Sequence, residues 1–272
     1  MEANELINFI KSLGVEVNAT TKARGYQGFY MKNRIDVSKN VSKDRFVPTL
    51  IHEFAHYVHS QIEPFVEKTG GTLEVLFDDK NISVYQDELY AVTNIVDKNS
   101  KCEKLKAHKN IIKNKIQSYE DKIKSTYPNF MRSKAFKEFD KYIKRSDARY
   151  LLKYDRVKLL KGFLFKKYVV ISVDNIEKDF EDMPIEFASY IRLKSCQKRQ
   201  ARVSARINKA QKYYSRPTEL FARFVEGLYI CPDEVKHTAP NTYKRFFELL
   251  QSGYYKQDLA RVIDKFYIPV NL

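Results

Sequence analysis

The stretch TLIHEFAHYVHS, at residues 49–60, constrains the fold of this chain more than any other feature. It contains three of the five histidines of the 272-residue sequence together with one glutamate: His52, Glu53, His56 and His59. Apolar residues surround them at helical spacing, with Ser42 upstream as a candidate N-cap and Pro64 downstream as a stop. We therefore predict a single helix that starts near Ser42–Asp44 and ends before Pro64.

The spacing of His52 and His56 is that of two metal ligands on one helix. Residues four apart share a helix face, so both imidazoles can reach one zinc ion at ~2.0–2.1 Å. Glu53 then stands beside the ion, where a carboxylate can take a proton from water. The alternative is a core helix that spells HExxH by chance. The candidate cap and the strands expected upstream favour the metal site.

His59 is not expected to complete the ligand set. It lies seven residues from His52, which corresponds to ~10.5 Å along a helix axis. One ion cannot bind both side chains, so we expect His59 to pack in the core or to form a hydrogen bond.

A third ligand must come from elsewhere, and Glu219 in the segment RPTELFARFVEGLY is the best candidate. It lies in the first turn of a helix opened by Pro217, and the small Ala222 allows close helix packing. Glu226 lies on the same helix face and is either a partner of one imidazole or the ligand itself. Two histidines and one glutamate leave a coordination position open, as in catalytic zinc sites.

These motifs resemble the gluzincin branch of zinc metallopeptidases. The run NRIDVSKNVSKDRFVPTLIHEFAHYVH is similar to that of ImmA/IrrE-like peptidases, and RPTELFARFVEGLY resembles a segment of the metallopeptidase domains in large polyvalent proteins of phages and mobile elements. The resemblance implies a zincin-like core, Zn²⁺ held by His52, His56 and Glu219, Glu53 as general base, and hydrolysis of a protein substrate. It does not cover the basic central segment, so it names no particular substrate.

Peptide hydrolysis also requires a hydrogen-bond donor for the developing oxyanion. Tyr213 is our candidate. Tyr214 is its neighbour and His237 a rival, and both tyrosines could instead be packing residues at the end of a helix. The region 28–36 is a candidate edge for an extended substrate, or simply an ordinary hairpin.

The positive charge of the chain is concentrated in its middle. Residues 101–212 contain 30 Lys and Arg against 13 Asp and Glu, whereas the remainder contains 19 against 21. Arg192, Arg199 and Arg206 recur every seven residues along a predicted helix, and such a stripe can bind nucleic acid or an acidic protein. The simpler alternative is a solvated helix face. A catalytically idle zincin scaffold that binds a partner through this segment is therefore the second functional hypothesis.

The sequence as a whole predicts a helix-dominated α+β fold, with a zincin-like core, a small edge sheet and an inserted basic, mostly helical segment. We divide it into residues 1–100, 101–183 and 184–272. Strands are expected at 26–31 and 34–38, joined by a tight turn. Helices are expected at 3–13, 83–96, much of 101–160, 184–213, and after Pro217 and Pro240. Residues 69–77 are read as a strand or loop, and 162–172 as β-like.

The cysteines lie far apart, at positions 102, 196 and 231, which indicates no disulfide framework and favours a reducing compartment. The N-terminal residues lack the basic and long apolar regions of a signal peptide, and no apolar run approaches ~18 residues. We therefore expect a cytoplasmic protein without membrane spans.

Overall fold

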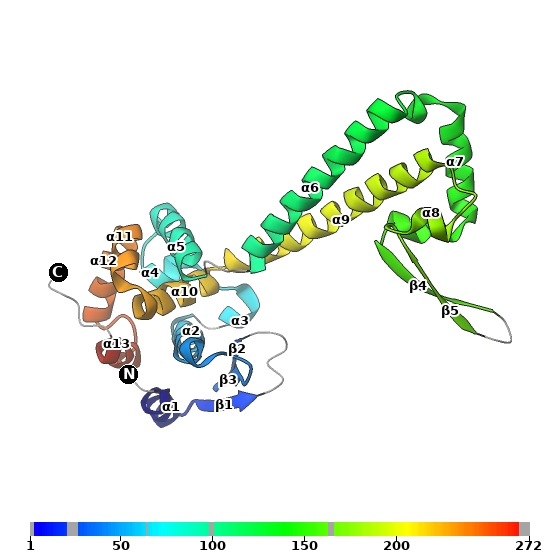
Figure 1. Cartoon of the computed structure of the whole chain (residues 1–272). Coiled ribbons are helices and arrows are strands. Elements are labelled where there is room, and N and C mark those ends of the chain that lie inside the picture. Colours follow the sequence, from blue (N-terminus) through cyan, green and yellow to red (C-terminus); the bar gives the residue numbers. More distant parts are fainter. Residues whose placement is uncertain (1–2, 21–26, 64, 98–100, 163–165, 267–272) are drawn as a thin grey trace. The chain divides into compact units, whose positions relative to one another are not determined.

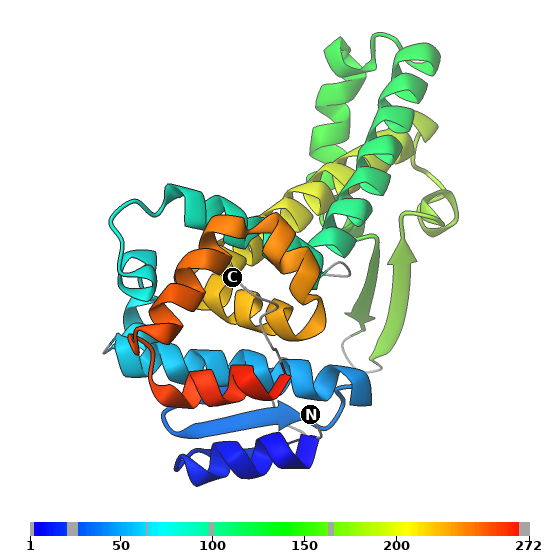
Figure 2. The ribbon, with the colours of Figure 1, turned by 90° about the vertical axis from the view of Figure 1, so that its left-hand side faces the viewer.

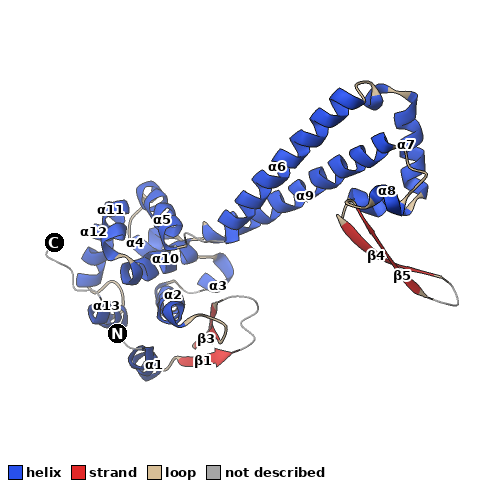
Figure 3. Ribbon diagram, viewed as in Figure 1, coloured by secondary structure: helices blue, strands red, loops and turns tan. Residues whose placement is uncertain are grey.

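The computed structural model describes residues 3–20, 27–63, 65–97, 101–162 and 166–266. They form two compact units, Met1–Lys98 with Gln211–Leu272, and Asn99–Ala210. Helices dominate both units and each contains one small sheet (Figure 1, Figure 3), as expected for the helix-dominated α+β class. Among the described helices, none combines the length and apolar character that crossing a membrane requires.

The sheet of the first unit has three strands in the order β1-β3-β2. The expected hairpin is confirmed: β2 (Gly28–Met31) and β3 (Arg34–Ser38) are antiparallel and joined by a two-residue turn. The first residue of the predicted strand 26–31 lies outside the described residues. We did not predict β1 (Glu16–Thr20), which pairs in parallel with β3. Its pairing joins segments that are distant in sequence, and the short alternation EVNAT is a weak local signal.

Helices make up the rest of this unit, which also contains the last residues of α9 (Ile185–Tyr214). Their bounds are α1 Ala3–Ser12, α2 Lys43–Ile62, α3 Val66–Thr69, α4 Leu73–Phe77, α5 Ser83–Val96, α10 Pro217–Ile230, α11 Pro232–Thr238, α12 Pro240–Gln251 and α13 Gln257–Phe266. The helix predicted around HEFAH is confirmed as α2. Ser42 occupies its N-cap position, but the serine side chain makes no capping hydrogen bond. Residues 69–77, expected as strand or loop, contain the helix α4, because Thr72 caps it and Leu73, Leu76 and Phe77 are buried on one side.

The core of the first unit lies around α10, which packs along both α2 and α5. Figure 2 shows α2 between the sheet and α10. Gly227 makes the approach to α5 close, since a Cβ there would lie 3.0 Å from a methyl of Val96. Ala222 is fully buried, as expected for a small residue in a tightly packed helix. This packing brings the start of α10 to the HEFAH helix.

The second unit is built on two long helices, α6 (Lys101–Thr126) and most of α9 (Ile185–Tyr214). Between them lie the 3₁₀ helices η1 (Phe130–Arg132) and η2 (Asp147–Leu152), the helices α7 (Lys134–Arg145) and α8 (Ile176–Asp179), and the antiparallel strands β4 (Arg156–Lys161) and β5 (Lys167–Ser172). Its own hydrophobic core gathers around Phe130, Phe139 and Phe187. Residues 156–160 belong to the region 101–160 that was expected to be mostly helical, but the strand RVKLLK at 156–161 alternates in burial and pairs with β5.

The division between the units differs from the one expected at residue 183. The second unit extends to Ala210, because the long helix α9 packs its buried residues Phe187, Ile191 and Leu193 into the second core. Only the end of α9 belongs with the first unit.

Candidate metal centre

Three predicted ligands converge in the first unit. His52 and His56 project from α2, and Glu219 comes from the first turn of α10. One ligand atom from each lies within 4.8 Å of the others, in a group that could hold a metal ion. His52 and Glu219 are buried, and His56 is partly exposed. The site is therefore built by two helices that are far apart in sequence and packed side by side.

The distances within this group suit a shared ion better than direct hydrogen bonds. Glu219 Oε2 lies 3.6 Å from His52 Nε2, and Glu219 Oε1 lies 3.5 Å from His56 Nε2. Both exceed ordinary hydrogen-bond lengths. Two ligand atoms at 2.0–2.2 Å from a tetrahedral ion stand about 3.4 Å apart. Glu219 Oε2 is buried and has no hydrogen-bond partner among the described residues. The donor set thus fits a divalent metal ion.

Glu226 supports the site from behind His52. Its Oε2 lies 3.0 Å from His52 Nδ1, so the other ring nitrogen, Nε2, faces Glu219. Arg45 and Arg223 donate to the same carboxylate, at 2.7 and 3.0 Å. A carboxylate on the far nitrogen of a ligating histidine fixes the ring and its tautomer. Of the two glutamates left open by the sequence, Glu219 is therefore the ligand candidate and Glu226 the partner of the imidazole.

Burial and neighbouring charges shift the pKa of each residue in the group. Burial and Arg223 lower the pKa of His52, but the carboxylates of Glu219 and Glu226 outweigh them and raise it to about 9. Burial lowers the pKa of His56 to about 4 against the attraction of Glu219. Burial raises the pKa of Glu219, but the two imidazoles prevail and bring it down to about 2. A metal ion at this position would therefore meet an ionised carboxylate and compete with a proton on His52.

Glu53 lies at the border between α2 and the sheet. Its carboxylate accepts a hydrogen bond from the backbone N–H of Tyr30 in β2. Gly28 is close by, since a Cβ at that position would lie 2.7 Å from Glu53 Cγ and Oε1. Burial raises the pKa of Glu53 to about 7, against the opposing charge of His52. A carboxyl that titrates near neutrality can both accept and return a proton.

The three candidate oxyanion donors differ in what their side chains contact. Tyr213 hydrogen-bonds Glu219, and burial raises the pKa of its hydroxyl far above the usual value. Tyr214 is 3.3 Å from Asp97 Oδ2 and so donates elsewhere. His237 is exposed on α11. Of the three, Tyr213 is the one that hydrogen-bonds a member of the ligand group.

His59 is fully buried and pairs with Glu63, at 3.2 Å between Nε2 and Oε2. It therefore packs and hydrogen-bonds, as expected, and does not join the ligand group. The same Glu63 oxygen accepts from the backbone N–H of Thr72, so this pair holds the segment before α4 against α2. Gly71 is required beside it, because a Cβ there would lie 2.4 Å from the imidazole.

The arginine stripe expected on α9 is largely engaged within the second unit. Arg192 donates to both carboxylate oxygens of Glu177, at 2.6 and 2.7 Å, and to the carbonyl of Val173 at 2.8 Å. Arg199 pairs with Asp155. Arg206 is exposed. Two of the three arginines that were predicted to bind nucleic acid or an acidic protein thus hold α9 to its own unit.

Comparisons of the chain with protein-family models, curated proteins and solved structures found no match. The site rests on its own geometry. Sequence reasoning missed Arg45 and Arg223, and it included Gly28 and Tyr30 only as part of the candidate substrate edge 28–36. A glycine within a short strand is a signal of close approach, and it could have indicated Gly28. The role of Tyr30 uses a backbone N–H and carries no sequence signal.

Proposed function

We propose that this chain is a zinc-dependent endopeptidase. The observation that carries the proposal is the convergence of His52, His56 and Glu219, with Glu53 next to them. Two imidazoles and one carboxylate are the ligand set of catalytic rather than structural zinc sites. Zinc suits the nitrogen and oxygen donors, and the resemblance to gluzincins points to the same ion.

Bound Zn²⁺ supplies a Lewis acid that activates water and polarises a peptide carbonyl. Glu53 accepts the proton of the attacking water and returns it to the leaving amine. The backbone N–H of Tyr30 holds this carboxylate beside β2. Tyr213 places a hydroxyl at Glu219, where it can donate to the oxyanion. Glu226 keeps His52 in the required orientation.

The strand β2 is the proposed edge for an extended substrate. It pairs with β3 on one side and with no other described strand. Gln27 turns its carbonyl toward β3, accepting from Ser38 at 2.7 Å, so by alternation Gly28 and Tyr30 direct their backbone groups to the edge away from β3. The N–H of Tyr30 indeed reaches Glu53. A peptide added to this edge therefore lies beside the proposed general base.

The test uses the full chain and three variants. Wild type loaded with zinc is expected to bind about one ion per chain and to cleave a peptide library. Glu53→Gln keeps the ion and loses cleavage, whereas His56→Ala loses both. Glu248→Gln, an exposed carboxylate on α12, is the matched control and behaves as wild type. Wild type without stoichiometric metal after reconstitution, or a Glu53→Gln variant as active as wild type, would refute the proposal.

The second candidate is a zincin-like scaffold that binds nucleic acid or an acidic protein and cleaves nothing. The basic excess of the second unit favours it, with 29 Lys and Arg against 13 Asp and Glu in residues 99–210. It predicts salt-dependent binding of a polyanion that Glu53→Gln leaves unchanged. A phage or mobile-element origin and a cytoplasmic location accompany the peptidase proposal, in keeping with three free cysteines.

A further inference from the structure

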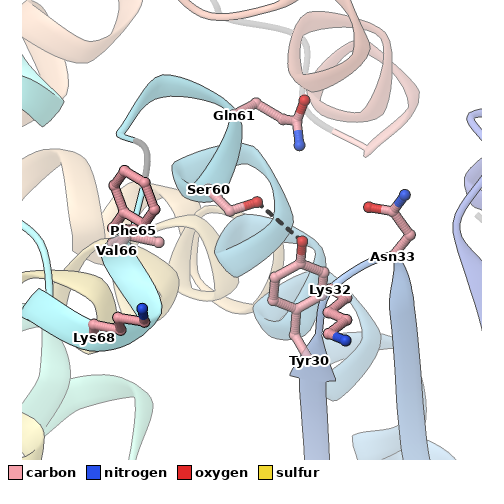
Figure 4. Close-up of a pocket in the computed structure, with 8 residues that line it drawn as sticks. All are labelled: Tyr30, Lys32, Asn33, Ser60, Gln61, Phe65, Val66 and Lys68. Atoms are coloured by element: carbon pink, nitrogen blue, oxygen red, sulfur yellow. Dashed lines mark hydrogen bonds between the residues drawn. The ribbon is translucent and has the colours of Figure 1, made fainter.

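A second feature of the first unit is a pocket at the end of α2. This open pocket has a volume of about 300 Å³. Its walls come from the β2–β3 hairpin, the last turn of α2 and the segment around α3 (Figure 4), and the lining residues are Tyr30, Lys32, Asn33, Ser60, Gln61, Phe65, Val66 and Lys68. The hydroxyl groups of Tyr30 and Ser60 are 2.9 Å apart and join the hairpin to the helix. None of these residues belongs to the metal ligand group.

The backbone around this pocket is held in unusual conformations. Lys32 has φ 55° and Phe65 has φ 69°, and they are two of the three described residues other than glycine with positive φ. The two-residue hairpin turn accounts for the positive φ of Lys32. At Phe65 this conformation is costly for a bulky side chain. The Phe65 ring is also 74% exposed. The Nζ atom of Lys68 lies 5.7 Å from the centroid of this ring, so Phe65 and Lys68 together form one side of the pocket.

Tyr30 connects the pocket to the proposed general base. Its backbone N–H donates to Glu53, while its side chain forms part of the pocket wall. Glu53 and Ser60 are seven residues apart on α2, or ~10.5 Å along the axis. An extended chain advances ~3.3 Å per residue. A peptide lying along the edge of β2 away from β3 therefore reaches the pocket about three residues from the bond at Glu53.

The chemistry of the walls selects what the pocket can hold. Lys32 and Lys68 bring two positive charges from different elements, and no Asp or Glu is among the described residues that line it. Phe65, Val66 and the Tyr30 ring supply apolar surface. A ligand side chain with methylene groups and a terminal carboxylate matches both properties.

We propose that this pocket is a specificity subsite that binds an acidic side chain of the substrate, glutamate in preference to glutamine, about three residues from the scissile bond. This inference rests on the proposed peptidase function. Both lysines are exposed, so each adds a modest attraction for the carboxylate, and the two together favour it over an amide. The subsite lies on the side of the scissile bond that faces the C-terminal ends of β2 and α2, near Lys32 and Ser60.

The inference is tested by peptide binding as well as by cleavage. Zinc-loaded Glu53→Gln is titrated with fluorescent peptides taken from cleaved library members, identical except for Glu, Gln or Lys at the third residue from the cleaved bond. The Glu peptide is expected to bind about tenfold more tightly than the Gln peptide. Adding Lys68→Glu removes this difference and favours the Lys peptide. Lys244→Glu, an exposed lysine on α12 outside the pocket, makes the same charge change and leaves the preference intact.

The outcomes separate the two proposals. Equal affinities for the Glu and Gln peptides, or a preference that survives both Lys68→Glu and Lys32→Glu, overturn the subsite, while cleavage lost in Glu53→Gln still supports the peptidase. A wild-type chain that cleaves no library member overturns the peptidase, and the subsite with it. A cleavage profile enriched in glutamate at this position, and lost in the lysine variants, supports both.

Discussion

The Nδ1 atom of His52 lies 3.0 Å from Oε2 of Glu226, which is buried beneath the ligand group. This contact decides that Nε2 of His52 faces Glu219. Glu226 in turn is held by Arg45 and Arg223. The orientation of one candidate ligand thus depends on a buried carboxylate outside the group of His52, His56 and Glu219.

Glu226→Gln is expected to weaken metal binding by about tenfold to a hundredfold, the usual effect of losing such a carboxylate. Metal competition with a chromogenic chelator measures it. Circular dichroism establishes that the variant is folded, and Glu226→Asp, which keeps the charge, is expected to recover part of the affinity. A folded Glu226→Gln variant with wild-type affinity would show that His52 needs no partner.

Gly28→Ala is expected to reduce kcat/KM by about a hundredfold, because its Cβ would displace the Glu53 side chain or the strand beside it. Metal content stays the same, since no ligand is touched. Gly253→Ala is the matched control: its φ of 77° makes the change unfavourable for stability, but nothing in contact links it to the site. Equal kinetics of folded Gly28→Ala and wild type would contradict the close approach of β2 and Glu53.

Tyr213→Phe is expected to lower kcat by about tenfold to a hundredfold with KM and metal content little changed, as for loss of one oxyanion donor. Tyr214→Phe serves as the control, since its hydroxyl contacts Asp97 instead. If both variants lose the same small amount of activity, Tyr213 acts through packing alone.

Glu53→Gln is expected to stabilise the metal-free protein at neutral pH. The pKa of Glu53 is raised from 4.5 to about 7, so the folded state binds more protons than the unfolded state between these values. Wild type therefore loses stability relative to the variant as pH rises through this window, reaching about 1–3 kcal/mol above it. Urea unfolding at several pH values measures the difference, which vanishes below about pH 4.5. A constant difference across pH would mean that burial of the charge is not its cause.

Arg192→Ala is expected to cost the second unit about 1–2 kcal/mol, because Glu177 and the carbonyl of Val173 lose their donor. The hydrogen bond from Arg192 lowers the pKa of Glu177. The contribution of this pair is therefore present above the unfolded pKa of a glutamate and fades as pH falls through the lowered value. Arg206→Ala, at an exposed position, should change stability by less than about 0.5 kcal/mol. Equal effects of the two changes in urea unfolding would show that the Arg192 contacts contribute little.

The sequence by itself determined the features that depend on local geometry. Histidines four residues apart share a face of any helix, so the relation of His52 to His56 follows from the HEFAH spacing alone. The helix α10 was likewise predicted from Pro217 at its start and from its apolar spacing. The β2–β3 hairpin was predicted together with its turn. The exclusion of His59 as a ligand required only the helical rise.

The tertiary structure decided every relation between segments distant in sequence. The choice between Glu219 and Glu226 as the candidate ligand depends on how α10 lies against α2. The contacts of Arg192 and Arg199 depend on where β5, α8 and the start of β4 pack against α9. The same holds for the parallel pairing of β1 with β3. Local propensities act over a few residues, whereas these contacts are set by the packing of whole helices and strands, which depends on all the side chains at each interface at once.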